Sequence, residues 1–149
     1  MCIRDRLGTL EFIDAAGHKS FLPKAPTAGA WWSTRLIGES MTIGIAEGVA
    51  TALSIDLVRG IPCVAAMSCG NMPRVAGWFA RHCPGREFRV FSDVGNGEDD
   101  ARKAAGLCGG RLELPTFSGE LLEAFKERTG TDKAPTDWND YYVATGDLP

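Results

Sequence analysis

The chain has 149 residues, 44% of them hydrophobic and 23% charged, which is enough for one domain with a buried core. Its formal net charge of −3 gives no overall attraction to nucleic acid, so a polyanion would need a local basic patch or a bound cation. No apolar run approaches the roughly 20 residues that cross a bilayer, which argues against a membrane protein. The nearest thing to a basic patch is a set of arginines that a solvent-exposed face explains better: Arg74, Arg81, Arg86 and Arg89.

The cysteines and histidines do not indicate a zinc site. The five cysteines contain no Cys-x-x-Cys pair, and the two histidines are far apart in the chain. An odd number of cysteines, several in apolar surroundings, is typical of reduced thiols. We therefore expect a cytoplasmic protein with no zinc in this fragment.

The N-terminal third of the chain reads as a β-rich lead-in. Residues 1–8 lack the apolar core of a signal peptide and match nothing downstream, so we interpret them as a truncated or artificial start. Residues 9–40 contain "TLEFID", a turn at "AAGHK" and "SFLP", a pattern that predicts two antiparallel strands. A Pro/Gly-rich connection then leads into "AWWSTRLIG", whose two tryptophans we expect in the core.

From residue 41 to residue 149, short apolar runs alternate with helical patterns. "MTIGIA" is followed by "VATALSIDLV", where Val49, Leu53 and Leu57 lie at helical spacing and predict a helix. "IPCVAAM" precedes a second helix, in which Pro73 falls in the first turn. "EFRVFS" and "RLELP" are two further strands, each followed by a helical segment.

This alternation predicts an α/β fold with a central parallel sheet of about four strands and helices on both faces, preceded by the short antiparallel lead-in. Parallel sheets place their chemistry at the carboxyl ends of the strands. Glu47, Ser68 and Asp93 fall there. Two carboxylates from different strands can hold Mg²⁺ through oxygen ligands, whereas either acid alone is explained equally well as a helix cap.

Several segments together resemble the Toprim domain, and more narrowly the Toprim domains of primases and primase-helicases from phages, plasmids and other mobile elements. These segments are "IGIAEGVATALSI", "GIPCVAAMSCGNM", "FRVFSD" and "TDWNDYY". The similarity runs from about Met41 to about Gly146. It implies a Toprim-like, Rossmann-like sheet, with Glu47 in acid/base chemistry on a phosphodiester and Asp93 at the first Mg²⁺ position; Mn²⁺ is a possible substitute.

The family's second metal-binding aspartate is absent, because Gly95 stands where the Asp-x-Asp pattern requires it. Glu98, Asp99 or Asp100 can replace that ligand if the glycine-rich turn brings one of them near. Alternatively, Glu47 and Asp93 hold the metal with more water than usual, or the site keeps binding and has lost catalysis. In the first alternative, Glu98 and Asp99 are the main candidate metal ligands, and Asp100 is a secondary candidate.

Asp137 and Asp140 in "TDWNDYY" are further secondary candidates, since the resemblance places them beside the active edge. Asp137 is also a good helix N-cap, which explains it at least as well. Candidate phosphate or nucleic-acid contacts are Gly48, Ser68, Gly95, Asn96 and Arg74. An ordinary helix start with Asn71 as its cap accounts for the Ser68 segment equally well.

The resemblance implies a fragment of a DNA primase or primase-helicase that performs Mg²⁺-dependent nucleotidyl or phosphodiester chemistry in primer synthesis for DNA replication. Its partners would be a single-stranded DNA template, nucleotides, and helicase or other domains of a parent protein, with no membrane involved. The alternative is a non-catalytic Toprim-derived module that binds nucleic acid or a replication partner through a degenerate metal site.

Overall fold

A five-stranded sheet forms the centre of the molecule in a computed structural model that describes residues 8–15, 18–95 and 97–149. The spatial order of its strands is β3-β5-β4-β6-β7. Strands β4, β5, β6 and β7 are parallel, and β3 joins the edge of β5 in the antiparallel direction. The strand bounds are β3 Trp32–Ser33, β4 Thr42–Ala46, β5 Cys63–Ala65, β6 Glu87–Phe91 and β7 Arg111–Glu113.

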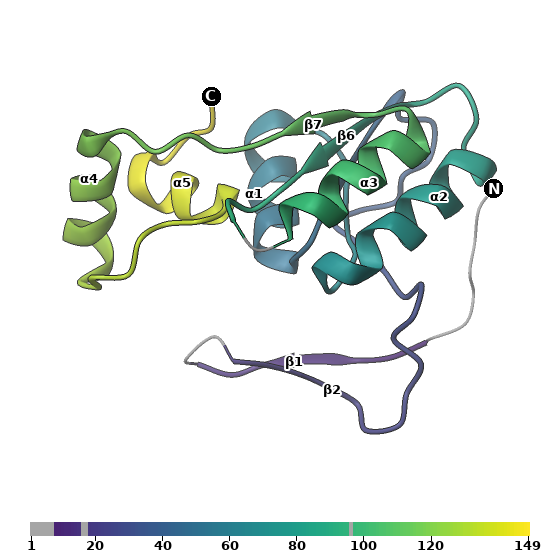
Figure 1. Ribbon diagram of the computed structural model, residues 1–149, viewed down its shortest axis with the longest axis horizontal. Helices are drawn as coiled ribbons and strands as arrows, with labels where there is room; N and C mark the ends of the chain where they lie inside the picture. The colour runs from purple at the N-terminus through teal and green to yellow at the C-terminus, as the bar shows by residue number, and fades with distance from the viewer. Residues whose placement is uncertain (1–7, 16–17, 96) are drawn as a thin grey trace.

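Helices follow each parallel strand, as the sequence pattern predicts. Their bounds are α1 Val49–Arg59, α2 Met72–His82, α3 Glu98–Cys108, α4 Gly119–Thr129 and α5 Trp138–Thr145, with a short 3₁₀ turn η1 at Cys69–Asn71. Helices α2 and α3 cover one face of the sheet, and α1 and α5 cover the other (Figure 1). The predicted α/β fold, with a mostly parallel sheet between helices, is confirmed.

The two faces of the sheet are separated by the alternation of side chains along β4. Ile43 and Ile45 are buried in the cluster beneath α2 and α3, together with Phe79. Ala46 points to the opposite face, where Ile55 and Trp138 pack against it. Gly44 also lies on that side, and a Cβ there would stand 2.8 Å from the Cys63 sulfur. The strand is therefore closely packed on both sides, which fixes where it ends along the sheet.

The predicted helix over "VATALSIDLV" is confirmed as α1, and it does not bury all of its apolar residues. Leu53 and Leu57 are 49% and 70% exposed, whereas Ala52 and Ile55 are fully buried and Val49 packs against the same cluster. Helical spacing therefore identified the helix but not its buried face.

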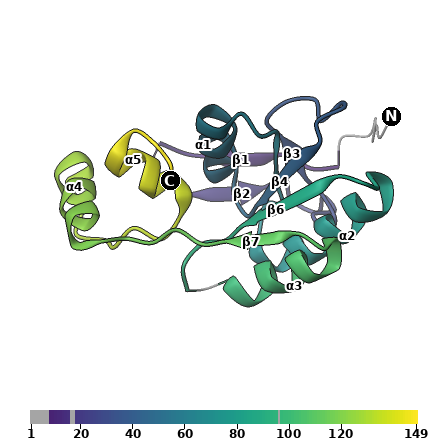
Figure 2. The same ribbon diagram turned by 90° about the horizontal axis from the view of Figure 1, so that it is seen from above.

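The lead-in forms the predicted antiparallel hairpin. Strands β1 (Glu11–Ile13) and β2 (Lys19–Phe21) pair with each other and lie apart from the five-stranded sheet (Figure 1). Seen from above, the hairpin lies behind the strands of the sheet (Figure 2). Of the two tryptophans expected in the core, Trp31 packs against Phe79, whereas Trp32 in β3 is 38% exposed. The predicted domain boundary at residue 40 stays a prediction, although the lead-in contributes β3 to the main sheet.

Asn71 fastens the lead-in to the sheet and does not cap α2 with its side chain. Its amide nitrogen donates to the carbonyl oxygens of Ala30 and Ala66, both at 2.8 Å, and its amide oxygen accepts from the Gly29 N–H at 2.7 Å. Asn71 thus stands at the N-cap position of α2, as the alternative interpretation expected, but its side chain makes no capping hydrogen bond. Within the described part of the chain, no helix is long and apolar enough to cross a membrane.

Candidate active site

The register of the sheet brings Glu47 and Asp93 to the same edge. Strands β4 and β6 are parallel neighbours in which Ala46 pairs with Phe91, and these are the last residues of the two strands. Glu47 follows β4 directly, and Asp93 follows β6 after one intervening residue. The Met67 N–H donates to the Glu47 carbonyl at 2.8 Å, which continues the ladder between β4 and β5 into the same edge.

Glu47 is not a helix cap. The N-cap of α1 is Gly48, no side chain bonds the free N–H groups there, and the first turn contains no acid. The Glu47 carboxyl instead lies near the backbone N–H of Cys69, in the loop that follows β5, and this N–H favours the ionised form and so lowers the pKa of Glu47. Burial raises the pKa of Glu47, and the nearby charge of Lys19 opposes that increase. A carboxyl with a raised pKa can exchange a proton closer to neutral pH, which is what acid/base chemistry requires.

Asp93 carries the clearest sign of a missing partner. Its Oδ1 is buried and has no hydrogen-bond partner among the described residues. Burial first, and then the charges of Asp137 and Glu47, raise the pKa of Asp93 to about 7. An ionised carboxylate oxygen held away from water without a partner is costly, and a bound cation would remove that cost.

Asp137 is both the N-cap of α5 and a neighbour of Asp93. Its Oδ1 accepts from the Asp140 N–H at 2.8 Å, and Asp140 returns bonds to the backbone in a capping box. The Val94 N–H donates to the Thr136 carbonyl at 2.7 Å, which ties the start of α5 to the segment after β6. Burial raises the pKa of Asp137. Capping and site membership are therefore compatible for this residue.

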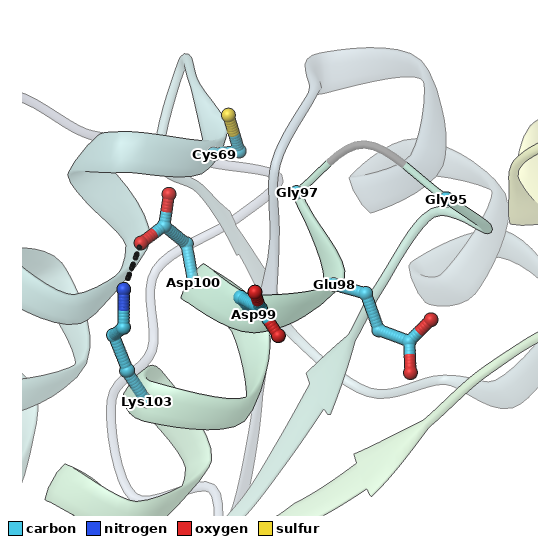
Figure 3. A pocket seen from close by; sticks show the side chains of 7 residues that line it. All are labelled: Cys69, Gly95, Gly97, Glu98, Asp99, Asp100 and Lys103. Carbon is cyan, nitrogen blue, oxygen red and sulfur yellow. Dashed lines mark hydrogen bonds and ion pairs between the residues drawn. The ribbon is translucent and has the colours of Figure 1, made fainter.

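The three acids at the start of α3 lie differently from one another. Glu98 forms an ion pair with Arg102 at 2.6 Å, Asp100 forms one with Lys103 at 3.2 Å, and Asp99 is exposed. Together with Cys69 they line an open pocket of about 510 Å³, in which Asp100 lies on the Cys69 side and Glu98 is directed away (Figure 3).

Only Asp100 of these three affects the strand-end acids, through a charge that raises the pKa of Glu47. The acids that act on Asp93 are instead Asp137, Glu47 and Asp140. The structure thus brings Glu47, Asp93 and Asp137 into mutual electrostatic range. Metal binding by Glu98 and Asp99 stays a prediction, and neither side chain is placed among the neighbours of Asp93.

The glycines of the turn before α3 are close to the acids. Gly95 and Gly97 have φ values of 90° and 103°, which favour glycine. A Cβ on Gly97 would stand 2.9 Å from the Cys69 Cβ and 3.3 Å from the Glu47 Oε2. Only glycine therefore lets the turn pass this close to Glu47, and Asn96, also predicted to contact phosphate, lies outside the described residues.

The remaining candidate phosphate contacts are Ser68, Arg74 and Gly48. Ser68 is exposed at the start of η1, on the same loop as Cys69. Arg74 is exposed on α2, and its Cδ lies next to Gly29 of the lead-in. Gly48 lies at the start of α1, beside Glu47. Their contact with phosphate stays a prediction.

Lys19 is the functional candidate that sequence reasoning missed. It belongs to β2 of the hairpin, yet its charge acts on Glu47, Asp93 and Asp137 alike. A Cβ on Gly48 would stand 3.0 Å from the Lys19 Nζ, so the ammonium group lies directly over the start of α1. Nothing in the local pattern of residues 18–21 signals this role, because it depends on how the hairpin is placed against the sheet.

The residues present fit Mg²⁺ when water completes the coordination. Across residues 8–15, 18–95 and 97–149, no three Asp, Glu, His or Cys side chains stand close enough to hold a metal ion as they lie. Mg²⁺ usually keeps several waters and takes one or two carboxylates, so a full protein cage is not required. The unpartnered Asp93 Oδ1 and the surrounding carboxylates supply the oxygen ligands that it prefers.

Carboxylates gathered at the carboxyl ends of the parallel strands of an α/β domain are typical of metal-dependent phosphate-processing domains. A family model described as the Toprim domain matches residues 42–147, and the chain belongs to that family. Toprim domains occur in primases, topoisomerases and nucleases, are usually catalytic phosphotransfer domains and generally use Mg²⁺. No solved structure matches the chain.

Proposed function

We propose that this protein performs Mg²⁺-dependent nucleotidyl or phosphodiester chemistry, in the context of primer synthesis by a DNA primase or primase-helicase. The observation that carries the proposal is the buried, unpartnered Asp93 Oδ1 among carboxylates at the edge of the sheet. The primase context is supported by the segments around Glu47 and Asp137 that resemble such enzymes. Single-stranded DNA and nucleotides are the substrates that this context implies.

Asp93 and Asp137 would hold the metal in this proposal, with water in the position that a second aspartate at residue 95 would fill. The bound ion would neutralise charge on the non-bridging phosphate oxygens. Glu47 would exchange a proton with the attacking or leaving oxygen, for which its raised pKa suits it. The nearby backbone N–H of Cys69 would favour the ionised form of the Glu47 carboxyl.

The test is a Mn²⁺ titration followed by electron paramagnetic resonance, with the wild type, Asp93→Asn and Glu47→Gln compared. Asp93→Asn should lose most of the metal affinity, and Glu47→Gln should bind metal but fail in primer synthesis and in cleavage of a phosphodiester. Glu127→Gln is the matched control, because Glu127 is an exposed acid of α4 and is not a candidate site residue. Wild-type metal affinity in Asp93→Asn would refute the site.

A non-catalytic binding module is the second candidate, and Gly95 is the observation that favours it. No carboxylate stands at this position, and the φ of 90° suits glycine. The same preparation discriminates between the two candidates. Metal-dependent binding of single-stranded DNA without turnover, in a protein that contains this chain together with any neighbouring domains, would favour the binding module.

A further inference from the structure

A lysine from the hairpin stands over the carboxylates at the edge of the sheet. Lys19 is exposed, and it lowers the pKa values of Glu47, Asp93 and Asp137. Lys19 is thus a basic residue whose charge acts on all three carboxyl groups.

The ammonium group of Lys19 lies close to Gly48. Its Nζ lies 3.0 Å from where a Cβ on Gly48 would stand, so any larger residue at position 48 would crowd it. Across the described residues, no ion pair of 4.0 Å or less joins Lys19 to a carboxylate. The ammonium group thus faces the acids across a gap and retains hydrogen-bond donors for another ligand.

Charge balance indicates what that ligand is. Ionised Glu47, Asp93 and Asp137 carry three negative charges, and a phosphodiester adds a fourth. One divalent ion neutralises two of these four, and Lys19 neutralises a third. Two-metal sites achieve this balance with a second ion, but the residue that would help to hold it is Gly95 here.

We propose that Lys19 is a phosphate-binding residue of this site, whose ammonium group donates to a non-bridging phosphate oxygen of a nucleic acid or a nucleotide and supplies part of the positive charge that a second metal ion would carry. The inference rests on the proposed function, since it assigns a further residue to the same site. Lysine is suited to this role as a compact charge on a flexible stem, which can reach a phosphate from a neighbouring element.

Two opposite effects of Lys19→Met follow from this geometry. Phosphate binding should weaken because the donor is gone. Binding of the divalent ion should strengthen, because a like charge that opposes it has been removed. A residue with a merely structural role in the hairpin would weaken both when replaced, so the split in direction identifies the role.

The experiment uses the whole chain and measures two affinities. Fluorescence anisotropy with a short labelled single-stranded oligodeoxynucleotide, at saturating Mg²⁺, should show about threefold to tenfold weaker binding for Lys19→Met. The slope of log affinity against log salt should fall by about 0.7, the value for one lost phosphate contact on a single strand. Mn²⁺ titration of the same variant should give an affinity about twofold to fivefold higher.

Two control variants accompany Lys19→Met. Lys19→Arg keeps the charge and should retain most of the oligonucleotide affinity. Lys24→Met removes a lysine of the same lead-in that is not among the charges acting on the three carboxyl groups, and should change neither affinity. A parallel competition with ATP separates the sources of phosphate, because a loss confined to ATP assigns the contact to a nucleotide and a loss on the oligonucleotide assigns it to the strand.

The two proposals fail separately. A wild type that binds no Mn²⁺ overturns the proposed function. Equal oligonucleotide and ATP affinities of Lys19→Met and the wild type overturn the role of Lys19, and so does a variant that weakens metal and phosphate binding together. Far-ultraviolet circular dichroism of each variant confirms that the comparison is made between folded proteins.

Discussion

Asp137 caps α5 and at the same time raises the pKa of Asp93, which lies after β6. The link between them is the hydrogen bond from the Val94 N–H to the Thr136 carbonyl at 2.7 Å, which brings the residue after one acid against the residue before the other. A late segment of the chain is thereby joined to the edge of the sheet. The two carboxylates repel each other until a cation or a proton intervenes.

The first prediction concerns this repulsion. Asp93→Asn should stabilise the metal-free protein at pH 8 by about 1 kcal/mol, because it removes a desolvated charge beside Asp137 and Glu47, and Tm should rise by about 2–4 °C. Differential scanning calorimetry in chelator measures the change. Added Mg²⁺ should raise the Tm of the wild type and leave that of the variant almost unchanged; an equal response of both proteins would contradict the prediction.

The second prediction is the pH dependence of stability. The pKa of Asp93 is raised from 3.8 to about 7 by burial and by neighbouring acids, so the folded state binds a proton that the unfolded state has lost. Stability without metal should therefore fall as pH rises from about 4 to about 7, and the raised pKa values of Glu47 and Asp137 act in the same direction. Urea unfolding at pH 5 and pH 8 measures this.

Asp93→Asn should reduce that pH dependence, and saturating Mg²⁺ should largely reverse the loss at pH 8, because the ion binds the ionised carboxylates. Metal binding should release protons near neutral pH, which calorimetry in buffers of different ionisation enthalpy detects. A wild type that is more stable at pH 8 than at pH 5 in chelator would show that the carboxylates are not destabilising one another.

The sequence predicted the fold, and it predicted that Glu47 and Asp93 lie at one edge of the sheet. Alternation of short apolar runs with helical segments predicts the parallel strands, and the register Ala46 to Phe91 then places Glu47 and Asp93 together as expected. The sequence could not predict which acid replaces the missing aspartate. Glu98 and Asp99 are close to Asp93 in sequence but are not among its electrostatic neighbours. Closeness along a turn that then enters a helix does not fix the direction of a side chain.

Lys19 shows the other limit of sequence reasoning. Its contact with Gly48 spans the junction between the hairpin and the sheet, and neither segment carries a periodic signal that would connect them. The exposed leucines of α1 are a related case, since helical spacing identifies the apolar positions of a helix but not which of them face the sheet. Both features depend on how elements pack, which local propensity leaves open.

The third prediction separates two aspartates of the capping box. Asp140 accepts from the Thr136 N–H at 2.8 Å and acts on Asp93 less than Asp137 does, whereas Asp137 both caps α5 and is the acid that acts most on Asp93. Asp140→Ala should cost about 1 kcal/mol of stability, as loss of a helix-start hydrogen bond does, with metal affinity reduced less than threefold. Asp137→Ser keeps a capping oxygen and should lose metal affinity at least about tenfold, so Mn²⁺ titration and urea unfolding should rank the two variants in opposite orders.

The fourth prediction tests whether the missing acid can be restored. Gly95 has a φ of 90°, and a Cβ there meets nothing within 4 Å, so an added side chain has space but the backbone is strained. Gly95→Asp should destabilise the protein by about 1–2 kcal/mol. If the carboxylate reaches the metal, Mn²⁺ affinity should rise despite that cost. Gly95→Ala is the control for backbone strain alone, and equal metal affinity of the two variants would place position 95 outside the site.

The last prediction concerns Arg59, which fastens the C-terminal helix to the sheet. Its guanidinium forms an ion pair with Glu113 at 2.6 Å and lies 5.0 Å from the centre of the Trp138 ring. Both charged side chains are largely buried, at 16% and 12% exposure.

Arg59→Met should therefore cost about 2–3 kcal/mol, somewhat less than full loss of a buried pair, because Arg89 remains 3.6 Å from Glu113. Since Trp138 follows Asp137, looser packing of α5 should also lower Mn²⁺ affinity. Urea unfolding followed by tryptophan fluorescence measures the stability. Arg111→Met, an exposed arginine of β7, is the matched control and should be neutral within about 0.5 kcal/mol. Equal stability of the two variants would show that Arg59 does not hold α5 in place.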